Sequence, residues 1–209
     1  MLLLVGLGNP GPEYARHRHN VGYMALDEIA RRHDFPAPRR RFQGLLAEGR
    51  LAGRKVLALK PTTFMNDSGR AVAEAARFYD VVPADIVVVH DEIDLMPGKL
   101  RVKAGGGGAG HNGLRSIDAH IGPEFRRIRI GIGRPRHKED VRRYVLHDFA
   151  KADHDWLGPL LAAIAEAAPL LAKDDDPGFA TKVALLLRPP GEKPRPRPAA
   201  PPAEPDAEA

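Results

Sequence analysis

Two short runs of almost wholly apolar residues constrain the fold more than any other feature of this sequence: Leu2–Gly6 (LLLVG) and residues 86–90 (IVVVH). Short apolar runs without polar alternation are typical of strands that are covered on both faces, as at the centre of a parallel sheet. Parallel strands need crossover connections, and segments with helical periodicity at 21–33, Ser68–Tyr79 and Asn112–Ile121 supply them. The sequence therefore predicts an α/β fold.

Further strand patterns complete the predicted sheet. We place strands at residues 45–50, 55–60, 86–91, 99–103 and 127–132, in addition to Leu2–Gly6. We find no internal repeat, and a chain of 209 residues with 43% hydrophobic composition suits one domain. We predict a single α/β domain over residues 1–187, with a mixed, mostly parallel, twisted central sheet and helices on both faces.

The end of the chain differs from this domain in composition. Residues 188–209 contain 8 of the 20 prolines, and they have no large apolar side chain. Such a segment cannot bury enough surface to offset the entropy lost on ordering, so we predict a disordered Pro/Ala-rich tail. Four basic and four acidic residues balance there, so the net charge of +5 resides in residues 1–187 and favours a polyanionic partner.

Composition and the N-terminal pattern also restrict location and chemistry. The longest apolar stretch, residues 157–171, is interrupted by Pro159, Glu166 and Pro169, so we expect no membrane span. The first residues lack the basic and long apolar regions of a signal peptide, which predicts a cytoplasmic protein. The sequence contains no cysteine, which excludes disulfides, thiol nucleophiles and thiolate zinc sites.

A glycine motif follows the first strand. Residues 6–11 (GLGNPG) match the dinucleotide-binding pattern G-x-G-x-x-G, which raises the possibility of a dehydrogenase. However, Pro10 and Pro12 lack two backbone N–H groups that would face a pyrophosphate, and no strand ends in an acidic residue about 20 positions on. A tight strand-exit loop is the alternative. It would place Asn9 at the carboxyl end of a strand, where open α/β sheets bind ligands.

Four further segments resemble ligand-binding loops, because each follows a strand or opens a helix: residues 17–22 (HRHNVG), 61–66 (PTTFMN), 90–94 (HDEID) and 105–113, which end in GHNG. Together with GNPG at 8–11, this ordered set closely resembles bacterial peptidyl-tRNA hydrolase over residues 1–187. The resemblance implies a single α/β domain that cleaves peptidyl-tRNA. One departure is His17, because the family usually has threonine at this position.

The residues themselves also favour a hydrolase. An ester needs an activated water, and neutral imidazole is the natural base near pH 7, which makes His19 the candidate base. The resemblance implies that His19 is catalytic and that Asp91 accepts its other ring N–H. Neither serine lies in a G-x-S-x-G elbow, and no H-E-x-x-H motif is present, so we predict neither a serine acyl-enzyme nor an essential metal or cofactor.

The remaining candidates would bind substrate. Amides both donate and accept, which suits a variable peptide main chain, and the resemblance implies that Asn9, Asn66 and Asn112 do so. It also implies that Tyr14 and Phe64 lie beside the tRNA 3′ end, with Met65 in the same groove. We place His111 near the substrate without a defined role. The preferred phosphate contacts are Lys103 and Arg134.

The predicted function is hydrolysis of the ester between a peptide and the 3′-terminal ribose of tRNA, without a cofactor. The resemblance implies that the enzyme is a monomer. The predicted partner is the acceptor arm and 3′ end of peptidyl-tRNA. A non-catalytic RNA-binding protein of the same fold is the alternative.

Overall fold

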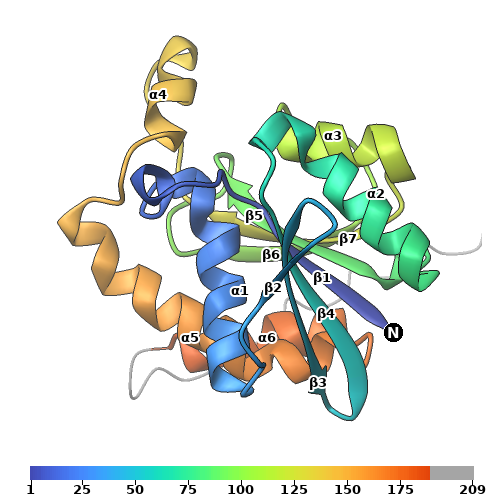
Figure 1. Ribbon diagram of the computed structural model, residues 1–209. Helices are drawn as coiled ribbons and strands as arrows, with labels where there is room; N and C mark the ends of the chain where they lie inside the picture. Colours follow the sequence, from blue (N-terminus) through green and yellow to red (C-terminus); the bar gives the residue numbers. More distant parts are fainter. Residues whose placement is uncertain (189–209) are drawn as a thin grey trace, which may run out of the picture.

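The computed structural model describes residues 1–188, and it confirms a single α/β domain built around one seven-stranded sheet (Figure 1). The predicted tail lies outside the described residues, apart from Arg188. The sheet order is β2-β3-β4-β1-β5-β7-β6. The strands are β1 (Leu2–Gly6), β2 (Arg39–Arg41), β3 (Gly44–Leu51), β4 (Arg54–Pro61), β5 (Ile86–Glu92), β6 (Leu100–Ala104) and β7 (Arg126–Gly131).

The centre of the sheet is parallel and its edges are antiparallel. Strand β1 pairs in parallel with β4 and β5, and β5 pairs in parallel with β7, whereas β2, β3 and β6 join through antiparallel pairs. All residues of β1 and β5 are buried, because these strands lie in the middle and are covered on both faces. The carboxyl ends of β1, β4, β5 and β7 therefore meet at one edge of the sheet.

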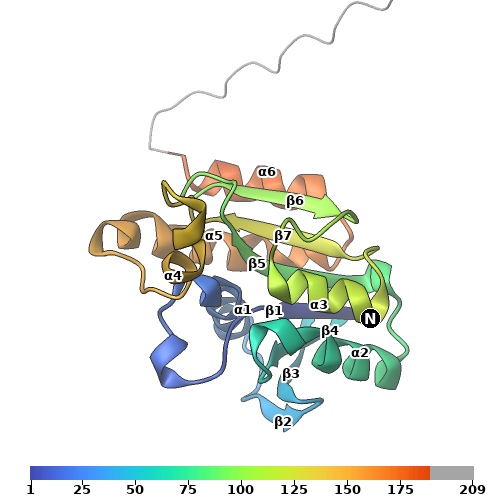
Figure 2. The same cartoon turned by 90° about the horizontal axis from the view of Figure 1, so that it is seen from above.

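Helices cover both faces of the sheet (Figures 1 and 2). Helices α1 (Val21–Arg32), α5 (His154–Leu171) and α6 (Asp176–Leu186) cover one face, and α2 (Ser68–Tyr79) and α3 (Asn112–Ile121) cover the other. The short helix α4 (Val141–Val145) stands away from the sheet in Figure 1. The 3₁₀ turns are η1 (Pro12–Tyr14), η2 (Arg18–Asn20), η3 (Met65–Asp67), η4 (Pro83–Asp85), η5 (Lys138–Asp140) and η6 (Lys151–Asp153).

The alternation of side chains along the central strands creates two cores. Leu2 and Leu4 of β1 point into the core under α1, α5 and α6, whereas Leu3 and Val5 point into the core under α2 and α3. All four side chains are fully buried. Burial of each contributes roughly 1.5–3 kcal/mol, which explains why these runs contain no polar residue before the strand ends.

Four elements were not predicted, namely strand β2 and helices α4, α5 and α6. Strand β2 consists of three exposed arginines at the sheet edge, and it has neither apolar alternation nor β-branched residues. Positive charge on an edge strand discourages pairing with other chains. Helix α5 continues through Pro159 and Pro169. One of its faces, which includes Leu157, Leu160 and Ile164, is buried in the core and offsets the hydrogen bonds that proline cannot make. Within residues 1–188, no helix has the length and apolar content needed to cross a membrane.

Candidate active site

A cavity of about 620 Å³ opens at the edge where the parallel strands end. Its walls come from segments that are distant in the sequence: the loops after β1, β4 and β5, the start of α3, and α4 with its preceding loop. Nine of the predicted site residues line it: Asn9, His19, Phe64, Met65, Asn66, Asp91, His111, Asn112 and Arg134. The structure thus brings most of the predicted site together.

The glycines of the first loop allow α1 to approach the sheet very closely. A Cβ atom on Gly6 would lie 2.4 Å from the carbonyl oxygen of Gly22, and one on Gly22 would lie 2.3 Å from the carbonyl oxygen of Val89. Only glycine fits such contacts. The motif at residues 6–11 therefore has a packing role that seats η2, and with it His19, against β5.

Asp91 joins two histidines at one carboxylate oxygen. His111 Nδ1 lies 3.1 and 3.3 Å from the backbone N–H groups of Gly113 and Leu114, so it accepts hydrogen bonds from them. In neutral His111 the proton must then be on Nε2, which donates to Asp91 Oδ1 at 3.0 Å. His19 Nδ1 donates to the same oxygen at 2.8 Å. This leaves His19 Nε2 with a free lone pair.

The pair of His19 and Asp91 shifts both of their pKa values. Burial opposes the charged form of His19, but the charge of Asp91 and the hydrogen bond between them raise the pKa of His19 above its ordinary value of 6.5. Burial also opposes the charged form of Asp91, yet His19 and His111 hold the pKa of Asp91 well below its ordinary value. The carboxylate is thus ionised throughout the neutral range.

Asn9 is fixed by a second asparagine. The side chain of Asn20, which is 1% exposed, accepts the backbone N–H of Asn9 at 3.0 Å and donates to its carbonyl oxygen at 2.9 Å. The Oδ1 atom of Asn9 accepts the backbone N–H of Met65 at 2.9 Å. Because that backbone group is a donor, the atom facing it must be the oxygen. The Nδ2 group of Asn9 is therefore the one that remains for a ligand, as a donor only.

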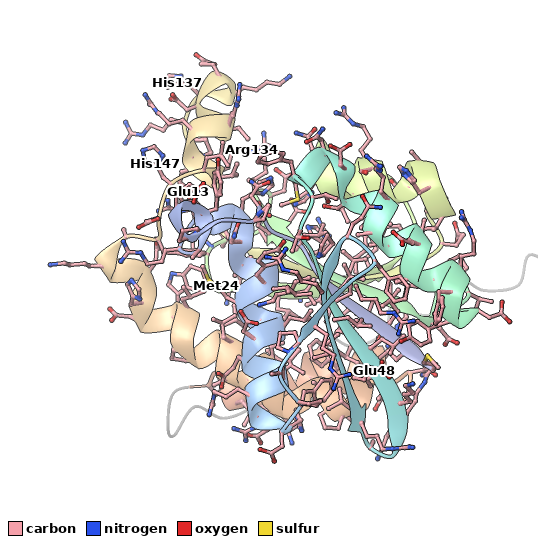
Figure 3. The ribbon with its side chains drawn as sticks, viewed as in Figure 1. Glu13, Met24, Glu48, Arg134, His137 and His147 are labelled. Carbon is pink, nitrogen blue, oxygen red and sulfur yellow. The ribbon has the colours of Figure 1, made fainter. Side chains whose placement is uncertain are left out.

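The other predicted substrate residues surround this centre. Met65 is buried beneath the cavity, and Phe64 is 60% exposed at its rim. Asn66 and Asn112 are exposed, and Asn112 Oδ1 accepts a hydrogen bond from Arg115 at 2.9 Å. Arg134 lies between α4 and the rest of the domain (Figure 3) and pairs with Asp94 at 2.6 Å.

Two predicted residues lie outside the cavity lining. Tyr14 is in η1, with its ring 5.4 Å from the ring of the unusual His17. His17 in turn lies 3.8 Å from Asp148. Lys103 is an exposed residue of β6 beside Gly106 of the glycine loop. The structure therefore separates Lys103 from the cavity that Arg134 lines.

The ligand-type atoms of His19, Asp91 and His111 lie within 4.8 Å of one another, which is a spacing compatible with a metal ion. The hydrogen bonds describe a different arrangement, because both histidines direct an N–H at Asp91 and His111 Nδ1 accepts from α3. The three groups form a hydrogen-bonded network rather than a set of lone pairs aimed at one point.

Several residues at the site were not singled out in the sequence. Asn20 and Arg18 lie within a segment that had been identified for His19, and His90 precedes Asp91 directly. Helix α4 contributes Val141, Arg142 and Val145 to the cavity. Five residues form too short a helix to show a periodic pattern, so helical periodicity could not indicate α4.

His90 lies fully buried beneath the histidine pair. Its Nδ1 donates to the backbone oxygen of Asp91 at 2.7 Å, whereas its Nε2 has no hydrogen-bond partner among the described residues. Burial, and then the charge of His111, lowers the pKa of His90 to about 3. His90 is therefore neutral in the folded protein near pH 7.

This burial predicts an acid-sensitive fold. In the unfolded chain His90 binds a proton below about pH 6.5, but in the folded protein it does so only near pH 3. The free energy of unfolding should therefore fall as pH decreases through this window, by up to about 1.4 kcal/mol per pH unit from this group. Urea unfolding between pH 4 and 7.5 should show a shallower pH dependence for His90→Gln. The exposed residue His137, changed to Gln, is the control, and equal slopes in the native protein and His90→Gln would contradict this account.

Comparison with known proteins identifies the family. The family model for peptidyl-tRNA hydrolase matches residues 3–187. The chain belongs to the peptidyl-tRNA hydrolase family. It is 64% identical over 194 residues to the peptidyl-tRNA hydrolase of Parvibaculum lavamentivorans, covering 92% of this chain and 95% of that protein. It is 61% identical over 188 residues to that of Bradyrhizobium diazoefficiens, covering 90% and 94%.

A solved structure agrees with this family assignment and with the fold. The crystal structure of peptidyl-tRNA hydrolase from Acinetobacter baumannii superimposes with a TM-score of 0.84 at 38% sequence identity, covering 88% of this chain and 94% of that one. Family, fold and enzyme class are thus as predicted, and the chain is an esterase of the peptidyl-tRNA hydrolase type. The roles of individual residues stay predictions.

Proposed function

We propose that this enzyme cleaves peptidyl-tRNA by direct attack of a water molecule that His19 deprotonates. The observation that carries the proposal is the hydrogen bond from His19 Nδ1 to buried Asp91, because it fixes the tautomer in which Nε2 is the basic atom. His19 lines the cavity, so a water held there is within reach of this nitrogen.

The proposed reaction has two steps. His19 Nε2 takes a proton from water as the oxygen attacks the ester carbonyl, and Asp91 stabilises the imidazolium that forms. When the tetrahedral intermediate collapses, the carbon–oxygen bond to the tRNA ribose breaks. His19 then returns the proton to the ribose oxygen, which releases free tRNA and the peptide acid. His111 keeps Asp91 in place by donating to the same oxygen.

Asn9 is proposed to recognise the blocked amino group of the substrate. Its Nδ2 is left as a donor by the hydrogen bond between Oδ1 and Met65. A blocked amino group carries an acyl oxygen that accepts such a bond, whereas the free ammonium of an aminoacyl-tRNA has no acceptor. Asn66 and Asn112 are proposed to contact the substrate near the scissile ester.

The tRNA is proposed to bind across the cavity mouth. Exposed Phe64 provides an aromatic face on which the terminal adenine can stack, a contact worth roughly 1–3 kcal/mol. Tyr14 is proposed to lie near the same end, and Arg134 and Lys103 to contact phosphates of the acceptor arm. Contacts of this kind make binding weaken steeply with salt. We further propose a cytoplasmic monomer that needs no cofactor.

Release of N-acetyl-amino acid and tRNA from N-acetyl-aminoacyl-tRNA, measured in the presence of a chelator, tests this function. The native chain should cleave this substrate much faster than the same aminoacyl-tRNA with a free amino group, because only the blocked form offers Asn9 an acceptor. Equal cleavage of both substrates would refute the role of Asn9. Binding of tRNA without cleavage of either substrate would support the non-catalytic alternative instead.

A further inference from the structure

The residue next to His19 is joined to a distant part of the chain. Arg18 donates through Nη1 to the backbone oxygen of Asp148 at 2.7 Å and through Nη2 to the Asp153 carboxylate at 3.1 Å. Its backbone N–H donates to the carbonyl oxygen of His147 at 3.0 Å. These partners follow α4 and lie 129 to 135 positions along the chain from Arg18. One arginine therefore joins the His19 segment, which is η2, to the loop between α4 and α5.

Arg18 also packs directly on α4. Its guanidinium carbon lies 4.4 Å from the centre of the Tyr144 ring and 5.6 Å from that of Phe149. The side chain is 12% exposed, so water screens these contacts little. A planar guanidinium can stack on a ring and donate from its edge at the same time, which a lysine ammonium cannot do.

Tyr144 extends these contacts toward Asp91, the partner of His19. Its hydroxyl donates to the carbonyl oxygen of Ile132 at 2.5 Å, and the backbone N–H of Ile132 donates to the backbone carbonyl oxygen of Glu92 at 3.1 Å. Glu92 follows Asp91 in β5. A continuous series of contacts thus joins Arg18, which is next to His19, through Tyr144 and Ile132 to β5, the strand that carries Asp91. The hydrogen bond between His19 and Asp91 completes the series.

These contacts join His19 to α4, which forms one wall of the cavity. Helix α4 contributes Val141, Arg142 and Val145 to the lining of the cavity. In Figure 1, α4 stands away from the sheet, and the contacts with Arg18 and Ile132 both involve Tyr144 of this helix. The position of a substrate bound between α4 and His19 therefore depends on the position of α4.

We propose that Arg18 is a positioning residue that holds α4 against the His19 segment, so that a substrate bound along α4 lies in line with His19 Nε2. This inference rests on the proposed function of His19. Arg18 has its charge paired with Asp153, and the partner of His19 is Asp91. Arg18 therefore sets the distance between α4 and His19 and does not change the proton affinity of His19.

Steady-state kinetics of Arg18→Met, Arg18→Lys and Tyr144→Phe test the proposal. Methionine keeps the apolar stem of the side chain without its hydrogen bonds, and we expect kcat to fall about tenfold or more, with KM changed less than about twofold. The pH midpoint of kcat/KM should not move. Lysine should restore kcat only in part. Arg31→Met, which removes an exposed arginine of α1, should behave like the native enzyme.

A double-mutant cycle separates positioning from a general loss of structure. If Arg18 and Tyr144 act as one connection, Arg18→Met combined with Tyr144→Phe should lower kcat no more than Arg18→Met alone, after correction for the folded fraction. Multiplying effects, an unchanged kcat, a rise in KM alone or a shifted pH midpoint would each overturn the proposal. His19→Asn in the same series shows whether the underlying mechanism holds, since an active His19→Asn would refute that mechanism and not only the role of Arg18.

Discussion

His19→Asn is expected to lower kcat/KM about 10³-fold, because general-base catalysis contributes on the order of 10²–10⁴ and asparagine cannot take a proton from water. Asparagine can still donate from its amide to Asp91 Oδ1, in place of the bond that His19 makes at 2.8 Å. The loss should therefore fall on kcat, with tRNA binding little changed. Rates from single-turnover release of labelled N-acetyl-aminoacyl-tRNA measure this directly.

The pH profile provides an independent readout of the same group. Only neutral His19 is a base, and Asp91 raises the pKa of His19 above 6.5. Activity should therefore decrease as pH falls, with a midpoint in kcat/KM above 6.5. A native profile that is flat from pH 5 to 9, or a His19→Asn enzyme with undiminished activity, would refute water activation by His19. The exposed histidine variant His137→Gln is the matched control and should keep the native midpoint.

Asp91→Asn is expected to lower kcat/KM on the order of 10²- to 10⁴-fold, through the tautomer of His19 and the lost stabilisation of its imidazolium. An asparagine oxygen can still accept from the histidines, but it carries no charge, and its NH₂ group can instead donate to His19 Nδ1. That second arrangement puts the proton on Nε2, the atom that must accept one. The pKa of His19 should also fall, because the charge that raises it is gone.

Two measurements check this prediction. The midpoint of kcat/KM should move to lower pH in Asp91→Asn, while the residual activity still requires His19. Circular dichroism and thermal unfolding must show that the variant is folded, since Asp91 is 3% exposed and joins two histidines. An Asp91→Asn enzyme with native activity and a native midpoint would show that His19 needs no anionic partner. Asp94→Asn, a change at an exposed carboxylate that pairs with Arg134, keeps the His19–Asp91 bond and should retain the midpoint.

The fold was largely predictable because its main determinants are local. Uninterrupted apolar runs indicated β1 and β5, and helical periodicity indicated α1, α2 and α3. Strand β2 was not predictable in this way, because three exposed arginines carry no strand pattern and pair only because β3 presents a free edge. Helix α4 has five residues, too few for periodicity, and its place depends on contacts with Arg18 and Ile132.

The sequence predicted which loops form the site, but not the hydrogen bonds between their side chains. Asn9 was expected at the carboxyl end of a strand, where open α/β sheets bind ligands, and the ordered motifs added His19, Asp91, Asn66 and Asn112. The sequence by itself therefore determined the sheet centre, the location of the site and the residue types available to it.

Only the tertiary structure decided how these groups are connected. Two histidines share one oxygen of Asp91, Asn20 orients Asn9, and Arg18 joins His19 to α4. These contacts connect residues between 11 and 135 positions apart. Hydrogen bonds depend on distances and angles between particular atoms, whereas periodicity reports only which face of an element is apolar. Hydrophobic patterning therefore predicted the layers of this enzyme, and the packing of the layers set its tautomers, its donors and its pKa values.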